Sequence, residues 1–276
     1  MPIMGLLVVL SCGQKSRSSS DIDEEEEEVR EELELKTCTF TDTVGIAHVE
    51  VRIDYPVKGE VKLVDAIRLY IAEVVGLESD EVELADAQGV TDYYGNSLMT
   101  TLSSLNEEFV NDEYVTELYH DWSFTKLYET DDYVTFLGES DIYEGGVHGI
   151  NYQSGITFFE NGQRFGKDML RKTDSDEFQK LLRNGLRSYF SHEGEELSDE
   201  NLAEELIVVE DVYQIPLPNA EPYFIEDGLH FVYQPYEISY YAAGMPEFTI
   251  PIKKMQPFLN KKAIRLLDLD DDDEDD

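Results

Sequence analysis

The sequence is poor in positive charge and in long apolar runs. It has 21 Lys and Arg residues against 61 Asp and Glu residues, which gives a formal net charge of −40 at pH 7. Nucleic-acid phosphates are bound through Lys and Arg, so this balance argues against a nucleic-acid partner and favours a cationic one. No stretch approaches the about 20 consecutive apolar residues that span a bilayer, so no transmembrane helix is expected.

Motifs for cofactors and metals are also missing. GGVHG at residues 145–149 has neither the Lys of a phosphate loop nor the spacing of a dinucleotide-binding fingerprint. The acidic C-terminus lacks the ligand and glycine spacing of an EF-hand. The chain has 2 cysteines, Cys12 and Cys38, which do not form a zinc motif. We therefore expect no cofactor and no metal site, and we expect Cys38 to be a buried structural thiol.

The residues that are abundant predict a folded body with acidic ends. Hydrophobic residues make up 41% of the chain, with 17 Tyr and 13 Phe, which is enough to fill a core. Acid is concentrated near both termini, in Asp21–Glu34 and in Asp268–Asp276. We predict an acidic, disordered tether at residues 13–36 and an acidic tail at residues 263–276.

The N-terminus has the pattern of a bacterial lipoprotein signal. A short apolar run from Met4 to Leu10 is followed by Ser11 and Cys12. We predict a signal at residues 1–12, lipidation of Cys12 and an extracytoplasmic protein anchored in the cell envelope, at the outer membrane or its periplasmic face. The run lacks a preceding Lys or Arg, and the alternative is an ordinary apolar N-terminus with a chance cysteine.

Hydrophobic periodicity in the body predicts an α+β fold of two small mixed units, each an antiparallel sheet packed against one or two helices. We place a smaller domain at residues 37–130 and a second at residues 131–262. Strands are expected within 37–56, 113–137, 155–159, 163–165, 207–215, 229–233 and 248–252. Helices are expected at 62–75, 97–109, 174–190 and 255–259, with a turn-rich segment at 78–96 and a connector or short helix at 192–205.

The segment from Asp227 to Pro251, DGLHFVYQPYEISYYAAGMPEFTIP, has the chain's most distinctive residue order. Its tyrosines could line a groove for a glycan or peptide, or pack between sheet and helix; because strand residues alternate in direction, we expect both outcomes. Glu237 could offer a carboxylate to a ligand or cap backbone amides in a turn, and capping is favoured. The candidate ligand-binding residues are His148, Tyr233, Tyr236, Glu237 and Tyr240, and none is assigned as catalytic.

His148 lies among three glycines that force a turn of the backbone. A lone histidine is usually a hydrogen-bonded turn residue. The alternative is a hydrolase in which His148 works with Glu237 or Asp227, and this requires the pair to lie within hydrogen-bond reach. A basic cluster on the helix at 174–190, Lys180, Arg183 and Arg187 with Arg171 and Lys172 just before, is expected to be a solvated face.

Four motifs in this order resemble a known family. EGGVHG, the hairpin ITFFENGQRF, EDGLHFVY and YQPYEISYYAAGMPEFTIP are similar to the C-terminal domain shared by the anti-sigma-V factor RsiV and the accessory region of a peptidoglycan deacetylase. The resemblance covers Tyr133 to about Asn260. A weaker likeness extends over residues 37–127 to the smaller domain that accompanies this family.

The resemblance implies an extracytoplasmic module without the deacetylase's catalytic domain and without the anti-sigma factor's transmembrane and cytoplasmic parts. In the anti-sigma factor this region binds lysozyme. We therefore expect a non-catalytic binding or sensing module, held at a membrane through a lipid anchor, whose ligand is a lysozyme-like cationic protein or a cell-wall or surface glycan. The hydrolase is the alternative.

Overall fold

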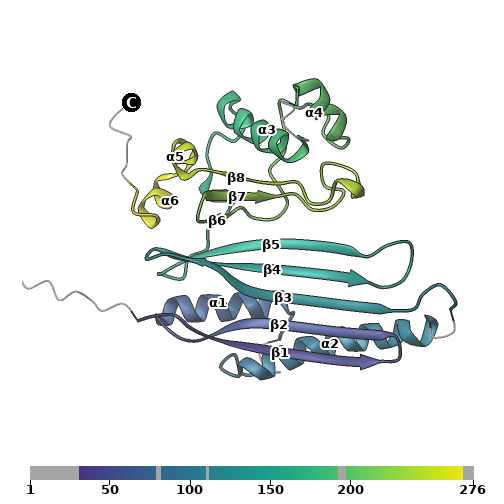
Figure 1. Cartoon of the computed structure of the whole chain (residues 1–276). Coiled ribbons are helices and arrows are strands. Elements are labelled where there is room, and N and C mark those ends of the chain that lie inside the picture. The colour runs from purple at the N-terminus through teal and green to yellow at the C-terminus, as the bar shows by residue number, and fades with distance from the viewer. Residues whose placement is uncertain (1–30, 79–81, 110–111, 192–196, 270–276) are drawn as a thin grey trace, which may run out of the picture. The chain divides into compact units, whose positions relative to one another are not determined.

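The computed structural model describes residues 31–78, 82–109, 112–191 and 197–269, and Figure 1 shows how their helices and strands are arranged. The predicted signal, including Cys12, lies outside these residues. Within the described residues, no helix is both long enough and apolar enough to cross a membrane.

The first half of the chain and the residues just after it form a five-stranded sheet. Its strands lie in sequence order and are β1 (Glu34–Val44), β2 (Ala47–Lys58), β3 (Leu118–Glu129), β4 (Tyr133–Tyr143) and β5 (Ile150–Phe159). Neighbouring strands are antiparallel except β2 and β3, which are parallel. Parallel neighbours need a long crossover, and here α1 (Val61–Val74) and α2 (Ala87–Phe109) supply it.

One face of this sheet is covered by α1 and α2. From Ala47 to Tyr55, every second residue of β2 is fully buried on that face, as the two-residue period of a strand requires. Helix α1 buries Ile67 and Ile71 in the same core. Cys38 of β1 is also buried and its thiol is free, and burial raises its pKa, so the prediction of a buried structural thiol is confirmed.

The opposite face carries a second, antiparallel sheet of β6 (Tyr223–Ile225), β7 (Gly228–Val232) and β8 (Glu247–Ile250). The buried ring of Tyr223 packs directly over Gly155 of β5, where a Cβ would collide with it. The backbone N–H of Phe224 donates to Oγ1 of Thr157 at 2.9 Å. These contacts hold the small sheet over one end of β4 and β5 and leave the rest of that face uncovered.

Helix α3 (Asp176–Phe190) packs on the far side of the small sheet, with the ring of Phe248 against Gly185. Its N-cap, Ser175, accepts a hydrogen bond from the N–H of Phe178, which satisfies one of the free donors at the start of the helix. The remaining helical elements are η1 (Lys167–Met169), α4 (Asp199–Glu205), η2 (Tyr241–Ala243), α5 (Ile252–Met255), η3 (Gln256–Phe258) and α6 (Lys261–Leu266).

The α+β class is confirmed, but the boundary expected between the two units cuts through one of the sheets. A boundary after residue 130 falls between β3 and β4, which are hydrogen-bonded neighbours, so residues 133–159 complete the first sheet. Both acidic ends are also shorter than expected. Strand β1 begins at Glu34, and α6 extends to Leu266 with Ala263 and Ile264 buried in the second core.

Two local predictions are wrong. Helix α2 begins at Ala87 rather than residue 97, because Asp86 accepts a hydrogen bond from the N–H of Gly89 at the start of the helix. Residues 207–215 form turns rather than a strand. The side chain of Gln179 replaces a partner strand there: it accepts from the N–H of Ile215 at 2.8 Å and donates to the carbonyl of Ile215 at 3.1 Å.

Candidate functional site

The uncovered part of the five-stranded sheet is hollowed into an open cavity of about 490 Å³. Four adjacent strands each place two residues, two positions apart, on its floor: Glu50 and Arg52 from β2, Asp121 and Ser123 from β3, Glu139 and Asp141 from β4, and Asn151 and Gln153 from β5. Met245, which follows η2, contributes to the wall. We call this cavity the sheet groove.

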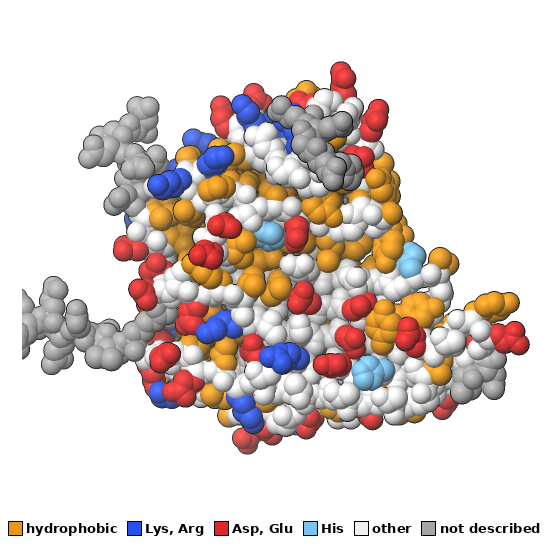
Figure 2. Space-filling model, in the orientation of Figure 1, with side chains coloured by type: hydrophobic (Ala, Val, Ile, Leu, Met, Phe, Trp, Pro, Cys, Tyr) orange, Lys and Arg blue, Asp and Glu red, His pale blue; other side chains and the backbone are white. Residues whose placement is uncertain are grey.

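The strand register lines these residues up in two rows across the sheet. In the first row Glu50 lies opposite Asp121, and Asp121 lies opposite Asp141. Side chains of directly opposite residues are roughly 5 Å apart, so three carboxylates stand next to one another. In the second row Arg52 is the groove's single cation. Figure 2 shows acidic side chains gathered over this part of the sheet.

Asp121 is the central group of the acidic row. It is half-buried, and its Oδ1 is buried without a hydrogen-bond partner in the described part of the chain. Burial raises the pKa of the Asp121 carboxyl, the charges of Glu50 and Asp141 raise it further, and His48 partly offsets them. An unpaired buried acceptor between two like charges destabilises the fold, which marks the position as a candidate binding site.

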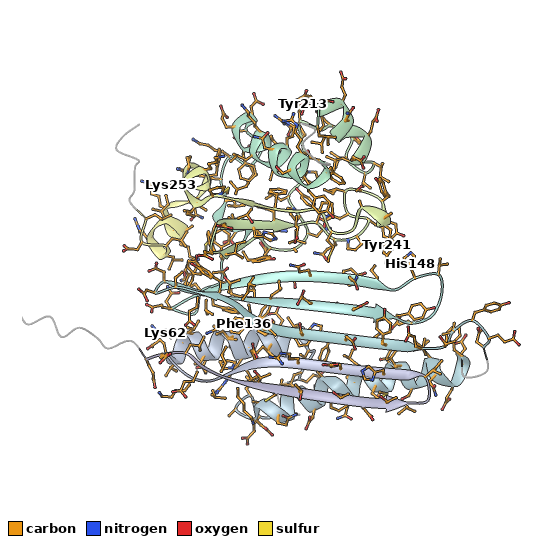
Figure 3. All side chains as sticks on the ribbon, viewed as in Figure 1. Lys62, Phe136, His148, Tyr213, Tyr241 and Lys253 are labelled. Carbon is orange, nitrogen blue, oxygen red and sulfur yellow. The ribbon has the colours of Figure 1, made fainter. Side chains whose placement is uncertain are left out.

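A cluster of aromatic side chains lies where the segment after β7 meets the turn between β4 and β5. The ring of His148 stacks on Tyr241 with centroids 3.8 Å apart, and Figure 3 shows the two side by side. Nδ1 of His148 lies 2.8 Å from the carbonyl oxygen of Gly149, which can only accept, so Nδ1 carries a proton. Tyr241 also donates to the same carbonyl at 2.6 Å.

Tyr236 joins this cluster by approaching both His148 and Tyr241. Its hydroxyl lies 3.5 Å from Nε2 of His148, at the limit of a hydrogen bond, and its ring centroid is 5.5 Å from that of Tyr241. Tyr236 has φ +67°, a left-handed conformation that is costly for a bulky residue, and 54% of it is exposed. The strained backbone therefore presents an aromatic ring to solvent.

The other predicted site residues have different roles. Tyr233 is fully buried and donates to the carbonyl of Pro216 at 2.8 Å, and burial raises its pKa, so it is a core residue without a surface for a ligand. Tyr240 is partly exposed and donates to a carboxylate oxygen of Glu205 at 2.7 Å, which raises its pKa.

Glu237 has the expected capping role. Its two oxygens accept from the backbone N–H of Asn219 at 2.5 Å and of Gln234 at 2.8 Å. Asp227 precedes the first residue of β7, at the other end of that strand from Tyr236. His148 therefore has neither carboxylate as a hydrogen-bond partner among the described residues, and the pairing that the hydrolase hypothesis requires is not formed.

The sheet groove was missed by reasoning from sequence, although a signal for it exists. Each contributing strand carries two polar residues two positions apart. In the sequence this pattern is the same as that of any strand with one face in solvent. Only the register, which places Asp121 between two acidic residues, distinguishes the groove from such a face.

Comparisons with known proteins show the fold and a match of one segment to a family model of unknown function. Residues 167–253 match the family model described as protein of unknown function (DUF3298). No curated protein matches the chain. The crystal structure of a DUF3298 family member from Bacteroides fragilis NCTC 9343 superposes with a TM-score of 0.67 at 21% identity, covering 85% of this chain and 96% of that one. A DUF3298 family protein from Pseudomonas aeruginosa PAO1 gives a TM-score of 0.52 at 13% identity, covering 84% and 95%.

Proposed function

We propose that the protein is a non-catalytic binding module that takes a cationic group of a partner protein into the sheet groove. The observation that carries this proposal is the row of three carboxylates with Asp121 at its centre. Four carboxylates and one guanidinium line the groove, so its floor is strongly negative before the charge of the rest of the molecule is added.

The groove fits a Lys or Arg side chain for electrostatic reasons. Like charges directly opposite each other in a sheet destabilise it, and a cation between them relieves the repulsion. Oδ1 of Asp121 is a buried acceptor without a donor, and an ammonium or guanidinium supplies donors without needing an acceptor. An acidic molecule of net charge −40 also attracts a cationic partner from a distance, which raises the association rate.

The partner class follows from the same features. The groove is open rather than enclosed, and Tyr152 and Met245 contribute apolar surface to its lining, so a side chain projecting from a protein surface can enter. The resemblance of residues 133–260 to a domain that binds lysozyme supports a lysozyme-like cationic protein as the first partner to test. We further propose that lipid on Cys12 holds the module at the extracytoplasmic side of the cell envelope.

The test is a titration of residues 31–276 against hen egg-white lysozyme by calorimetry at two salt concentrations. We expect saturable binding that weakens as salt rises. Asp121→Asn and Asp141→Asn should each weaken binding roughly 10- to 150-fold, since loss of a charge-assisted contact at an interface is worth roughly 1.5–3 kcal/mol. The matched control is Glu107→Gln, which removes one exposed carboxylate from α2, and it should change the affinity less than twofold.

Two results would overturn the proposal. One is an equal effect of the groove variants and Glu107→Gln, which would show attraction to net charge rather than a site. The other is retention of a neutral wall or surface glycan, with no binding of lysozyme or of other cationic proteins. Hydrolysis of peptidoglycan that is lost in His148→Ala would support the hydrolase instead.

A further inference from the structure

One stripe of α3 carries polar side chains at every fourth position: Gln179, Arg183 and Arg187. The sequence predicted that the basic residues of this helix form a solvated face. Lys180 is exposed as expected, but only 9% of Arg183 is exposed. The prediction is therefore wrong for Arg183, which is a charged side chain held inside the protein.

The residues on either side of Arg183 in this stripe have hydrogen-bond partners. The side-chain amide of Gln179 bonds to both backbone groups of Ile215. Nη2 of Arg187 donates to Oδ1 of Asp199, the first residue of α4. The second oxygen of Asp199 accepts from the hydroxyl of Tyr213 at 3.2 Å. Both oxygens of Asp199 are therefore occupied by groups other than Arg183.

Arg183 itself forms no hydrogen bond and no ion pair with the described residues. Its Nη1 is buried without a partner, and its guanidinium lies over the ring of Tyr213, 4.7 Å from the centroid. Burial removes the hydration of a charge, and stacking on an aromatic ring restores only part of that loss. Nε of Arg187 is also buried without an acceptor among the described residues. This surface therefore has donors and positive charge in excess.

We propose that Arg183 binds the carboxylate of a ligand, and we call the surface of Arg183, Arg187 and Tyr213 the Arg183 site. Nε and Nη2 of Arg183 lie on one edge of the guanidinium, and neither is among the fully buried atoms without a partner. The two N–H groups on that edge match the two oxygens of a carboxylate. The ligand therefore supplies the acceptors that the described residues do not.

The charge of the site selects a carboxylate over a phosphate. Arg183 and Arg187 carry two positive charges and Asp199 carries one negative charge, which leaves one positive charge. A carboxylate balances it, whereas a phosphate group carries about 1.5 to 2 negative charges at pH 7 and leaves an excess. That excess is unfavourable in a molecule of net charge −40.

Tyr213 determines how a ligand reaches the site. Its ring covers Arg183, 52% of the residue is exposed, and Figure 3 labels it beside α3 and α4. The N–H of Tyr213 donates to Oδ1 of Asp211 at 2.9 Å, which fixes the turn that carries the ring. A ligand therefore enters along the edge of this ring, where a small organic acid and a peptide present the same carboxylate. The site is on a different surface from the sheet groove, so the inference does not depend on the proposed function.

Thermal unfolding of the full chain at pH 7, in sodium acetate and in sodium chloride of the same ionic strength, tests the site. A ligand that binds only the folded state raises its Tm. With about 100 mM acetate and a Kd on the order of 10 mM, the Tm should be about 3–6 °C higher than in chloride. Sodium phosphate of the same ionic strength should give a smaller rise. An equal Tm in acetate and chloride would overturn the proposal, and a larger rise in phosphate would overturn the choice of a carboxylate.

Arg183→Met ties the effect of acetate to the site, because methionine keeps an extended side chain over Tyr213 without the charge. The variant should lose the acetate-dependent rise in Tm. Its Tm in chloride should be at least that of the natural chain, since an apolar group in place of an unpaired buried charge is neutral or stabilising. The matched control is Arg265→Met, which removes an exposed guanidinium from α6 and should keep the rise. A rise that persists in Arg183→Met, or that is lost equally in both variants, would contradict the proposal.

NMR of the natural chain gives a measurement that needs no variant. The Nε–H resonance of Arg183 should shift saturably as acetate is added, whereas that of Arg265 should not. Benzoate and acetyl-diglycine, added in the same way, distinguish a small aromatic acid from a peptide carboxylate by which of them saturates the shift at lower concentration. If the Arg183 resonance does not move, or moves no more than that of Arg265, the site does not exist.

Discussion

Asp121→Asn should stabilise the protein while weakening its binding, which is an unusual combination for a half-buried residue. The substitution keeps the shape of the side chain and removes its charge. In the folded state that charge stands opposite Glu50 on one side and Asp141 on the other, and its Oδ1 has no partner among the described residues. The unfolded chain has no such arrangement, so the repulsion counts against folding.

The magnitude follows from the number of like-charged neighbours. A directly opposite pair of like charges in a sheet costs about 0.2–1 kcal/mol, and Asp121 has two such neighbours. His48 attracts the Asp121 charge and offsets part of this cost. We therefore expect a gain of about 0.5–1.5 kcal/mol at pH 7, which corresponds to a rise in Tm of about 1–6 °C for a unit of this size.

The gain should depend on pH in a definite direction. Burial and the neighbouring acids raise the pKa of Asp121 above its usual 3.8. Between that value and the raised pKa the folded state keeps a proton that the unfolded chain has lost, so the stability of the natural protein falls as pH rises through this window. The variant lacks this decrease. Its advantage should be complete at pH 7 and absent near pH 3.

Urea unfolding of both proteins at pH 3, 5 and 7, with Glu107→Gln as the control, measures these differences. The gain at pH 7 should also shrink in 1 M salt, because Glu50 and Asp141 are exposed and salt screens them. A loss of stability at pH 7, or a gain of the same size at pH 3, would refute the electrostatic description of the groove.

Three further substitutions test the packing and the corrected site assignments. Gly155→Ala should destabilise the chain by about 1–3 kcal/mol, since a Cβ there meets the buried ring of Tyr223 between the two sheets; unchanged urea midpoints would contradict this packing. Tyr233→Phe should lower the free energy of unfolding by about 1–2 kcal/mol, because the carbonyl of Pro216 loses its donor. The same variant should bind lysozyme as the natural chain does, and weaker binding by calorimetry would show that Tyr233 is a site residue. Asp268→Gly should raise the free energy of unfolding by about 1 kcal/mol, because glycine adopts the left-handed φ of the helix end without strain; a decrease would mean that the Asp268 side chain has a stabilising role there.

Elements with local signals were predictable from sequence. The helix expected at residues 62–75 is observed at Val61–Val74, and the helix expected at residues 174–190 is observed at Asp176–Phe190. In each case neighbouring residues carry the information, because side-chain periodicity and turn geometry act over a few positions.

Elements that depend on partners distant in the sequence could not be predicted. Residues 207–215 have the apolar content of a strand, but Gln179, about thirty residues earlier, satisfies the backbone of Ile215 in place of a neighbouring strand. The start of α2 was missed because Gly89 and Gly95 resemble turn residues, whereas Gly95 is needed for the close approach of the Phe40 ring from β1.

The sequence alone determined the acidic character, the α+β class and the buried state of Cys38. It could not determine which surface is a candidate site. Tyr233 and Tyr236 are three residues apart and look equivalent, yet the first is in the core and the second is exposed with a left-handed backbone. The groove arises because strand pairing sets Asp121 between Glu50 and Asp141, residues 71 and 20 positions away, and such a register exists only in the folded chain.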